Sequence, residues 1–307
     1  MSSRREFIRQ SLYGGAGFAL MNAFPFDALA SEDVTRITIL HTNDVHSRIE
    51  PFPLTDPKWP GLGGIARRAA LIKKIREQEK HVLLLDAGDF FQGTPYFNLY
   101  GGELELKLMS EMGYDAGTLG NHDFDNGISG LVKQMPHASF PFLCANYDFS
   151  DTELNGKTVP YKIFKKDDIR IGVFGLGIEL EGLVDKKMYG STRYLDPLGQ
   201  AAHYAHLLKK DEKCDLVVCL SHLGYKYQDK KVSDVDLAKQ SKNIDLILGG
   251  HTHTLLEQPL AYRNSDNKEV LVAQVGWAGI RLGKIDFVFK KKNKKFHSEG
   301  TSIKISK

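Results

Sequence analysis

Apolar and polar residues alternate along the chain in blocks that predict strands and helices in turn. The β-branched run at residues 36–42 and the continuous apolar run at residues 82–85 have the composition of strands, and the second is typical of a strand buried on both faces. Between them, residues 63–80 carry apolar side chains at helical spacing, at Ile65, Ala69, Ile72 and Ile75. This part of the chain therefore predicts a strand, an amphipathic helix and a second strand.

The same alternation continues toward the C-terminus. Apolar periodicity predicts two further helices, at residues 103–113 and 198–210, and apolar runs predict three further strands, at residues 169–177, 214–224 and 244–254. A late β-hairpin is predicted around the glycines of residues 269–290. Alternating strands and helices favour a layered α/β domain, and the late hairpin with the long middle section indicates a second sheet.

Five apolar segments end in aspartate, asparagine or histidine. These polar residues are Asp44 and His46, Asp89, Asn121 and His122, His222, and His251 and His253. In α/β proteins the carboxyl ends of the strands converge on one crevice. We therefore expect these side chains, which are distant in sequence, to meet in space.

A site formed by these residues would contain carboxylates, imidazoles and one amide, but no thiolates. Nitrogen and oxygen ligands suit Mn²⁺, Zn²⁺, Fe or Mg²⁺ rather than a thiolate-bound structural zinc. The potential ligands are too many for one four-coordinate site but fit two metals that share a bridging carboxylate. Two metals roughly 3.5–4 Å apart stabilise the attacking and leaving oxygens of an in-line displacement, which is phosphoester chemistry.

Composition and charge exclude some classes of protein. A hydrophobic content of 42% and a charged content of 26% are ordinary for a globular protein, and a net charge of +3 does not indicate a nucleic-acid or membrane partner. The three cysteines form no CxxC pair, so neither a zinc ribbon nor a dense disulfide framework is expected. The lysine-rich run at residues 290–297 is interpreted as a solvated tail, so no nucleic-acid partner is expected.

The first thirty residues resemble a targeting segment. Twin arginines, Arg4 and Arg5, precede an apolar, glycine-bearing stretch, and Ala28 and Ala30 supply the small residues of a cleavage site. Residues 1–30 are therefore predicted to be a twin-arginine signal peptide, with a periplasmic catalytic domain at residues 31–307. The apolar stretch falls short of the roughly 20 residues that span a bilayer, so no stable membrane insertion is expected. The alternative is an ordinary first helix.

Five motifs resemble a known family. In order along the chain they are HTNDVH, AGDFFQG, GNHDFD, LSHLG and GGHTHT, and together they resemble the calcineurin-like metallophosphoesterases, in particular the 5′-nucleotidase branch. The similarity covers residues 36–290, and the stretch VGWAGIRLGKIDF also resembles that branch. The resemblance implies an α/β fold, a four-layer α/β/β/α sandwich of two mixed β-sheets, with a dinuclear metal site at the C-terminal ends of the strands.

The resemblance also implies which residues bind the metals, which would be two divalent ions of Mn, Zn, Fe, Co or Mg. Asp89 would bridge them. The first metal would be bound by Asp44, His46 and His253, and the second by Asn121, His222 and His251.

Two further residues would act on the substrate. By the same resemblance, His122 faces the substrate phosphate, where it stabilises transition-state charge or helps the leaving oxygen depart, and Asp125 orients it. The nucleophile would be a metal-activated water. Asp86 is interpreted as a turn residue or a support for the ligands, Asp123 as a loop residue where relatives commonly carry glutamate, and His41 as structural.

The substrate is less determined than the chemistry. Longer members of the branch carry a C-terminal domain that holds the nucleoside, and this chain ends about where that domain would begin. Three alternatives follow: a separate polypeptide supplies a C-terminal nucleotidase domain, the substrate is not a nucleoside monophosphate, or aromatic residues of this chain hold the leaving group, with Phe52, Trp59, Tyr189 and Tyr194 as candidates.

The leading interpretation is a 5′-nucleotidase-type phosphomonoesterase that acts on a small phosphoester such as a nucleotide. Within the enzymes, the alternatives are a phosphodiesterase, for example on 2′,3′-cyclic nucleotides, and a sulfur-ester hydrolase on the same scaffold. An alternative of another class is a non-catalytic binding subunit that keeps the fold.

Overall fold

The computed structural model describes residues 33–307, and the description below concerns the compact unit Thr35–Lys307. The signal peptide predicted for residues 1–30 lies outside the described residues. Periplasmic export therefore stays a prediction from the sequence. Within residues 33–307, no helix has the length and apolarity needed to cross a membrane.

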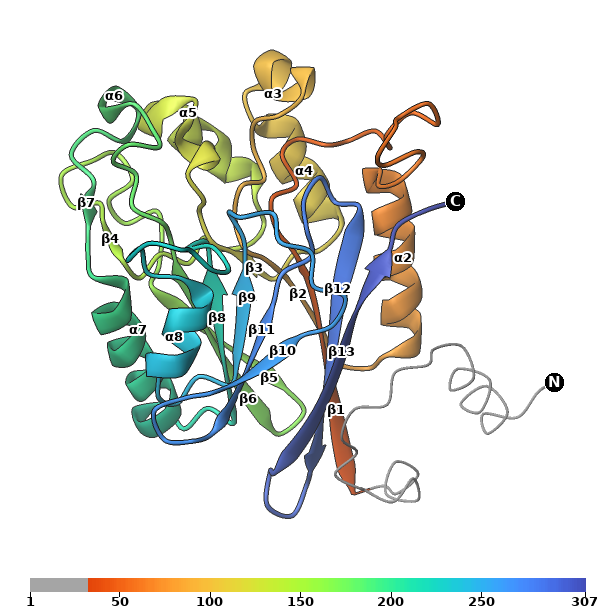
Figure 1. The fold of residues 1–307 in the computed structure, drawn as a ribbon, viewed down its shortest axis with the longest axis vertical. Helices are drawn as coiled ribbons and strands as arrows, with labels where there is room; N and C mark the ends of the chain where they lie inside the picture. Colours follow the sequence, from red (N-terminus) through yellow and green to blue (C-terminus); the bar gives the residue numbers. More distant parts are fainter. Residues whose placement is uncertain (1–32) are drawn as a thin grey trace. The chain divides into compact units, whose positions relative to one another are not determined.

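Two β-sheets form the centre of this unit (Figure 1). The first has five strands in the order β13-β12-β1-β2-β3; β1, β2 and β3 are parallel, and β12 and β13 are antiparallel. Its strands are β1 (Val34–Thr42), β2 (Val82–Asp86), β3 (Ala116–Gly117), β12 (Arg281–Lys290) and β13 (Phe296–Lys304).

The second sheet has six strands in the order β10-β11-β9-β8-β6-β5. Its four central strands are parallel, and the edge strands β5 and β10 run antiparallel to their neighbours. The strands are β5 (Tyr161–Lys166), β6 (Ile169–Leu176), β8 (Leu216–Ser221), β9 (Leu246–Gly249), β10 (Leu260–Arg263) and β11 (Glu269–Ala273). A separate short pair joins β4 (Tyr147–Asp148) and β7 (Arg193–Tyr194).

Helices cover the outer face of each sheet, as Figure 1 shows for α2 and α4 on one side and α7 and α8 on the other. The α-helices are α2 (Ile65–Gln78), α3 (Pro95–Tyr100), α4 (Glu103–Glu111), α5 (Gly127–Gln134), α6 (Lys186–Tyr189), α7 (Pro197–His206) and α8 (Asp234–Gln240), and the short 3₁₀ helix η2 spans His122–Phe124. The order of layers is helix, sheet, sheet, helix, so the expected four-layer α/β sandwich with two mixed sheets is confirmed.

The strand β2 explains how the layers are held together. Because successive side chains of a strand point to opposite faces, Leu84 packs with the helices α2 and α4, whereas Leu83 and Leu85 pack between the two sheets. Every residue of β2 is buried. The continuous apolar run that predicted this strand therefore reflects burial on both faces.

Two expectations about the C-terminal part are wrong. The apolar segments predicted as one hairpin at residues 269–290 are β11 and β12, which belong to different sheets. The glycine-rich stretch between them crosses from one sheet to the other instead of turning back. The lysine-rich run is not a tail: it forms the turn of the β12–β13 hairpin, and Lys294 donates hydrogen bonds to Asp168 O and Asp215.

His41, in the buried part of β1, makes stability depend on pH. Its Nδ1 atom is buried without a hydrogen-bond partner, and burial lowers the pKa of His41 to about 3. In the unfolded chain the imidazole of His41 takes up a proton near pH 6.5, whereas in the folded protein it does so only near pH 3. The free energy of unfolding therefore falls as the pH falls from about 6.5 toward 3.

We expect the free energy of unfolding to fall between pH 7 and pH 5 by about 2 kcal/mol more in the wild type than in His41→Leu. Chemical denaturation of both proteins at the two pH values measures this difference. Equal losses in the two proteins would show that His41 is not the responsible group.

Candidate metal centre

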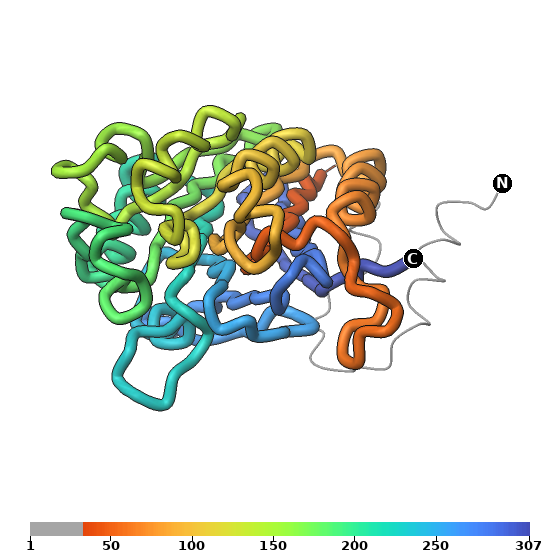
Figure 2. The backbone as a smooth tube through the Cα atoms, turned by 90° about the horizontal axis from the view of Figure 1, so that it is seen from above, coloured from red at the N-terminus to blue at the C-terminus, as the bar shows by residue number. Residues whose placement is uncertain are grey.

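The polar residues that follow the strands meet at one edge of the unit. Figure 1 shows the carboxyl ends of β2, β8 and β9 directed toward the same edge, and Figure 2 looks down on it. Two groups of side chains there could each hold a metal ion, because their ligand atoms lie within 4.8 Å of one another. The first group is Asp44, His46 and His253, and the second is Asp89, His222 and His251.

The first group combines residues after β1 with a residue after β9. Oδ1 of Asp44 lies 3.4 Å from Nε2 of His253 and 3.9 Å from Nε2 of His46. The two imidazole Nε2 atoms are 3.0 Å apart. Three ligand atoms therefore face one small volume.

The second group includes Asn121, which the sequence also predicts as a ligand. Oδ2 of Asp89 lies 3.0 Å from Nε2 of His222, and Oδ1 of Asn121 lies 2.8 Å from Nδ1 of His251. Oδ2 of Asp89 is also 3.9 Å from Nε2 of His46 in the first group. Oδ1 of Asp44, in the first group, is likewise 3.9 Å from Nε2 of His222 in the second. The seven predicted metal ligands therefore gather at one place, where Asp44 and Asp89 each reach both groups.

The chemistry of these donors fits two divalent cations. Nε2 of His222 is buried and lacks a partner with hydrogen-bond geometry, although Asp89 is adjacent. A buried nitrogen without a partner is costly, and a cation bound between His222 and Asp89 would satisfy both. Desolvation works against the protonated ring, yet the charge of Asp89 raises the pKa of His222 to about 10, so a bound cation would take the place of that proton.

Burial favours the ligating form of two other histidines. It lowers the pKa of His46, and it lowers the pKa of His251 to about 4. Both rings are therefore neutral at pH 7, which is the form that binds a metal.

The backbone at the site is held in a conformation that side chains rarely adopt. Several non-glycine residues there have φ angles of 50–70°, in the left-handed region: Asp44, His46, Asp89, His251 and His253. Such angles cost of order 1–3 kcal/mol each and persist where surrounding structure enforces them. Hydrogen bonds between adjacent loops do so here: Asp44 N donates to Gly88 O at 2.9 Å, and His46 N donates to Asp89 O at 3.0 Å.

Asp123 joins the loops that follow β2 and β3. Its buried carboxylate accepts hydrogen bonds from the backbone N–H groups of Asp89 (3.0 Å), Phe91 (3.1 Å) and Gly120 (2.8 Å). The carboxylate therefore fixes the backbone next to Asp89 and Asn121. This agrees with the loop role expected for Asp123.

Asp123→Ala is expected to lower the free energy of unfolding by about 3 kcal/mol, because three buried N–H donors lose their acceptor. Denaturant unfolding measures the change. Asp125→Ala is the matched control, since Asp125 is partly exposed and the expected loss is below about 1 kcal/mol. Equal losses would contradict the proposed role of Asp123.

His122 and Asp125 form a pair beside the two groups. Nδ1 of His122 lies 2.7 Å from Oδ2 of Asp125, and the His122 side chain is 42% exposed. The hydrogen bond to Asp125 raises the pKa of His122, and partial burial opposes that rise. The ring centroid of His122 is 5.3 Å from that of His46, so an accessible imidazole with a tendency to be cationic adjoins the first group.

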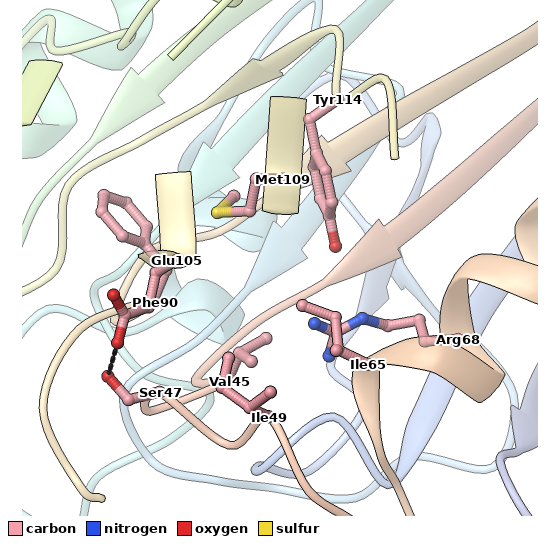
Figure 3. A pocket seen from close by; sticks show the side chains of 9 residues that line it. All are labelled: Val45, Ser47, Ile49, Ile65, Arg68, Phe90, Glu105, Met109 and Tyr114. Carbon is pink, nitrogen blue, oxygen red and sulfur yellow. Dashed lines mark hydrogen bonds between the residues drawn. The ribbon is translucent and has the colours of Figure 1, made fainter. Parts of the chain in front are cut away.

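A polar network that the sequence did not predict lies near the loop of Asp44 and His46. Ser47 donates a hydrogen bond of 2.6 Å to Glu105 of α4, and both side chains are buried (Figure 3). They line a cavity of about 10 Å³ together with Arg68, which is 1% exposed. The helical spacing of α2 predicts only apolar residues on its buried face. The burial of Arg68 on that face therefore could not be predicted from the sequence pattern.

The structure also separates the aromatic candidates for holding a leaving group. Phe52 and Tyr189 are each only 7% exposed, so their rings pack inside the protein and present little surface to a leaving group. Trp59 and Tyr194 are partly exposed.

Asp86 is buried and accepts hydrogen bonds from Thr42 (2.6 Å) and Gly88 N (2.8 Å), which agrees with its expected supporting role.

Comparison with known families decides the class of this fold and site. The model of the calcineurin-like phosphoesterases matches residues 37–255, which include all seven predicted ligands. The chain belongs to the calcineurin-like phosphoesterase family. Within this family of metallophosphoesterases, its matched region is the N-terminal domain of the 5′-nucleotidase family, so the resemblance stated from the five motifs is confirmed.

Individual relatives support this placement. The chain is 34% identical over 292 residues to snake venom 5′-nucleotidase of Gloydius brevicauda, covering 88% of this chain and 48% of the relative. It is 37% identical over 246 residues to 5′-nucleotidase of Vibrio cholerae, covering 74% and 42%. The solved structure of a 5′-nucleotidase precursor from Thermus thermophilus superposes with a TM-score of 0.80 at 33% identity, covering 88% and 55%. The chain thus spans about half the length of these relatives.

Proposed function

We propose that this calcineurin-like phosphoesterase hydrolyses phosphomonoesters of the 5′-nucleotide type and uses two divalent cations. The observation that carries the proposal is that two nitrogen–oxygen ligand groups adjoin, linked by the carboxylates of Asp44 and Asp89, next to the partly exposed ring of His122. The names of the relatives supply the substrate class.

The chain's own residues would divide the work in the following way. Asp44, His46 and His253 would hold one cation, Asn121, His222 and His251 the other, and Asp89 would contact both. When bound, the cations would lower the pKa of a water molecule and neutralise phosphate charge.

His122 would act on the substrate directly. Asp125 holds Nδ1 of the imidazole, so Nε2 is the ring nitrogen left to interact with a phosphate oxygen or the leaving oxygen. A cationic His122 donates a hydrogen bond there and stabilises the negative charge that develops in the transition state. Asp125 stabilises that cationic form and fixes the plane of the ring.

Aromatic side chains of this chain are candidates for contact with the leaving group. Because Phe52 and Tyr189 are buried, Trp59 and Tyr194 are the better candidates among the aromatics of this chain. The relatives extend over about twice the matched length. A separate polypeptide that corresponds to the rest of the relatives stays a prediction.

A panel of substrates tests the proposal. The purified full chain, supplied with Mn²⁺, is assayed on AMP, p-nitrophenyl phosphate, 2′,3′-cyclic AMP, bis(p-nitrophenyl) phosphate and an aryl sulfate. We expect kcat/KM on AMP to exceed that on either diester by about 100-fold or more, a difference of about 3 kcal/mol in transition-state stabilisation. Faster turnover of a diester or of the sulfate than of AMP would show that the proposed substrate class is wrong. No turnover of any substrate by protein with bound metal would favour the non-catalytic binding subunit.

A further inference from the structure

His253 is held differently from the other histidines of its neighbourhood. Nδ1 of His46 lies 3.2 Å from Gln92 O, and Nδ1 of His222 lies 2.7 Å from Ala87 O. Such contacts with carbonyls orient a metal-binding imidazole. Among residues 33–307, no hydrogen-bond partner lies on Nδ1 of His253, and its ring instead stacks on the indole of Trp277, with centroids 5.6 Å apart and an interplanar angle of 8°.

The backbone around Trp277 connects the two chain segments that form the first group. Gly276 N donates a hydrogen bond of 3.0 Å to Thr254 O, next to His253. Ala278 N donates one of 2.7 Å to Asp44 O. Trp277 lies between these two donors, so its position is fixed relative to both segments.

The indole is also supported on the side of the loop after β1. The ring of Phe52 packs edge-on against Trp277, with centroids 5.9 Å apart and an interplanar angle of 63°. The guanidinium of Arg48 lies over the Phe52 ring, 4.2 Å from its centroid. These side chains form a row that begins at the predicted metal ligand His253 and continues through Trp277 to the buried ring of Phe52. The guanidinium of Arg48 lies above that ring.

We propose that Trp277 is a positioning residue for the first ligand group. Its indole face holds the imidazole of His253, so that Nε2 faces Asp44 and His46, and thereby raises the affinity of this group for its cation. This inference rests on the proposed two-cation site but not on the identity of the substrate. The apolar run that contains Trp277 gave no sign of this role, because the contact joins residues from different loops.

Binding of Co²⁺ to metal-free full-length protein tests the inference without an activity assay. The chain has two tryptophans, so Trp59→Phe leaves Trp277 as the only one. We expect Co²⁺ to quench most of the tryptophan fluorescence of Trp59→Phe, because Trp277 stacks on His253. Trp277→Phe, which keeps only the indole of Trp59, should show a smaller change.

Calorimetric titration with Co²⁺ then measures the affinities themselves. Trp277→Leu, which keeps apolar volume without a ring, is expected to weaken one of the two binding events about 10-fold and leave the other unchanged. Trp277→Phe, which keeps an aromatic face, is expected to restore most of the affinity. Trp59→Phe is the matched control and should bind both cations as the wild type does.

The possible failures are distinct. If the wild type binds no Co²⁺, the proposed two-cation site is wrong. If the wild type binds two ions and Trp277→Leu binds both with unchanged affinity, the role of Trp277 is wrong. If Trp277→Leu does not fold, the fluorescence of Trp59→Phe decides, because an indole stacked on a metal ligand must respond to Co²⁺ and an unchanged signal overturns the inference.

Discussion

Asp89→Asn is expected to lower kcat on a phosphomonoester by on the order of 10³-fold, equivalent to about 4 kcal/mol of transition-state stabilisation. Asp89 reaches both ligand groups, 3.0 Å from His222 and 3.9 Å from His46. Asp44 also lies 3.9 Å from both histidines, and it is the family resemblance that gives Asp89 the shared position. The amide keeps the shape of the side chain but removes the negative charge that two cations would share. Metal analysis of the variant should therefore show fewer than two bound ions.

Asp245→Asn is the matched control for this prediction. Asp245 precedes β9 at the end of the sheet opposite the candidate centre, where it accepts hydrogen bonds from Val217 N and Lys209. Its replacement is expected to leave kcat within about 2-fold of the wild type, since surface and remote changes act mainly on stability. An Asp89→Asn variant with wild-type kcat and two bound ions would exclude Asp89 as the shared ligand.

His122→Ala is expected to lower kcat by on the order of 10²–10⁴-fold, the usual contribution of a positioned acid or base. It should leave the bound metal at the wild-type level, because His122 belongs to neither ligand group. Asp125→Asn should lower kcat less, by about 10-fold, since the imidazole remains but loses the carboxylate that favours its cationic form.

The leaving group distinguishes the two roles open to His122. If the imidazole protonates the leaving oxygen, the loss in His122→Ala is larger on AMP, whose alkoxide is a poor leaving group, than on p-nitrophenyl phosphate. If it only stabilises charge on the phosphate, the losses on the two substrates are similar. A variant that retains wild-type kcat on both substrates would remove His122 from the mechanism.

The alternation of apolar and polar residues predicts much of the fold because burial acts locally. The runs that became β1, β2, β8 and β9 are rich in apolar residues, and a ligand of the candidate centre follows the end of each strand within a few residues. The convergence of parallel strands at their carboxyl ends then places distant residues together. Assignment of each ligand to a particular metal came from the family resemblance and not from the pattern.

Other features depend on contacts between segments and leave no local signal. The pattern around residues 269–290 cannot tell whether two apolar strands pair with each other or join different sheets, and here they join different sheets. Arg68 is buried on the apolar face of α2 against residues of another helix. The stack of Trp277 on His253 and the three backbone donors to Asp123 likewise exist only after the loops have met.

Titration of metal-free protein with Mn²⁺, with phosphate release from AMP as the readout, is the decisive test of a two-cation phosphomonoesterase. We expect no release without added metal, and a rise in rate that reaches its plateau at two equivalents of Mn²⁺ per chain. The same plateau should be absent in Asp89→Asn. Full activity in the metal-free protein, or two bound ions with no release of phosphate from any monoester, would contradict the proposed function.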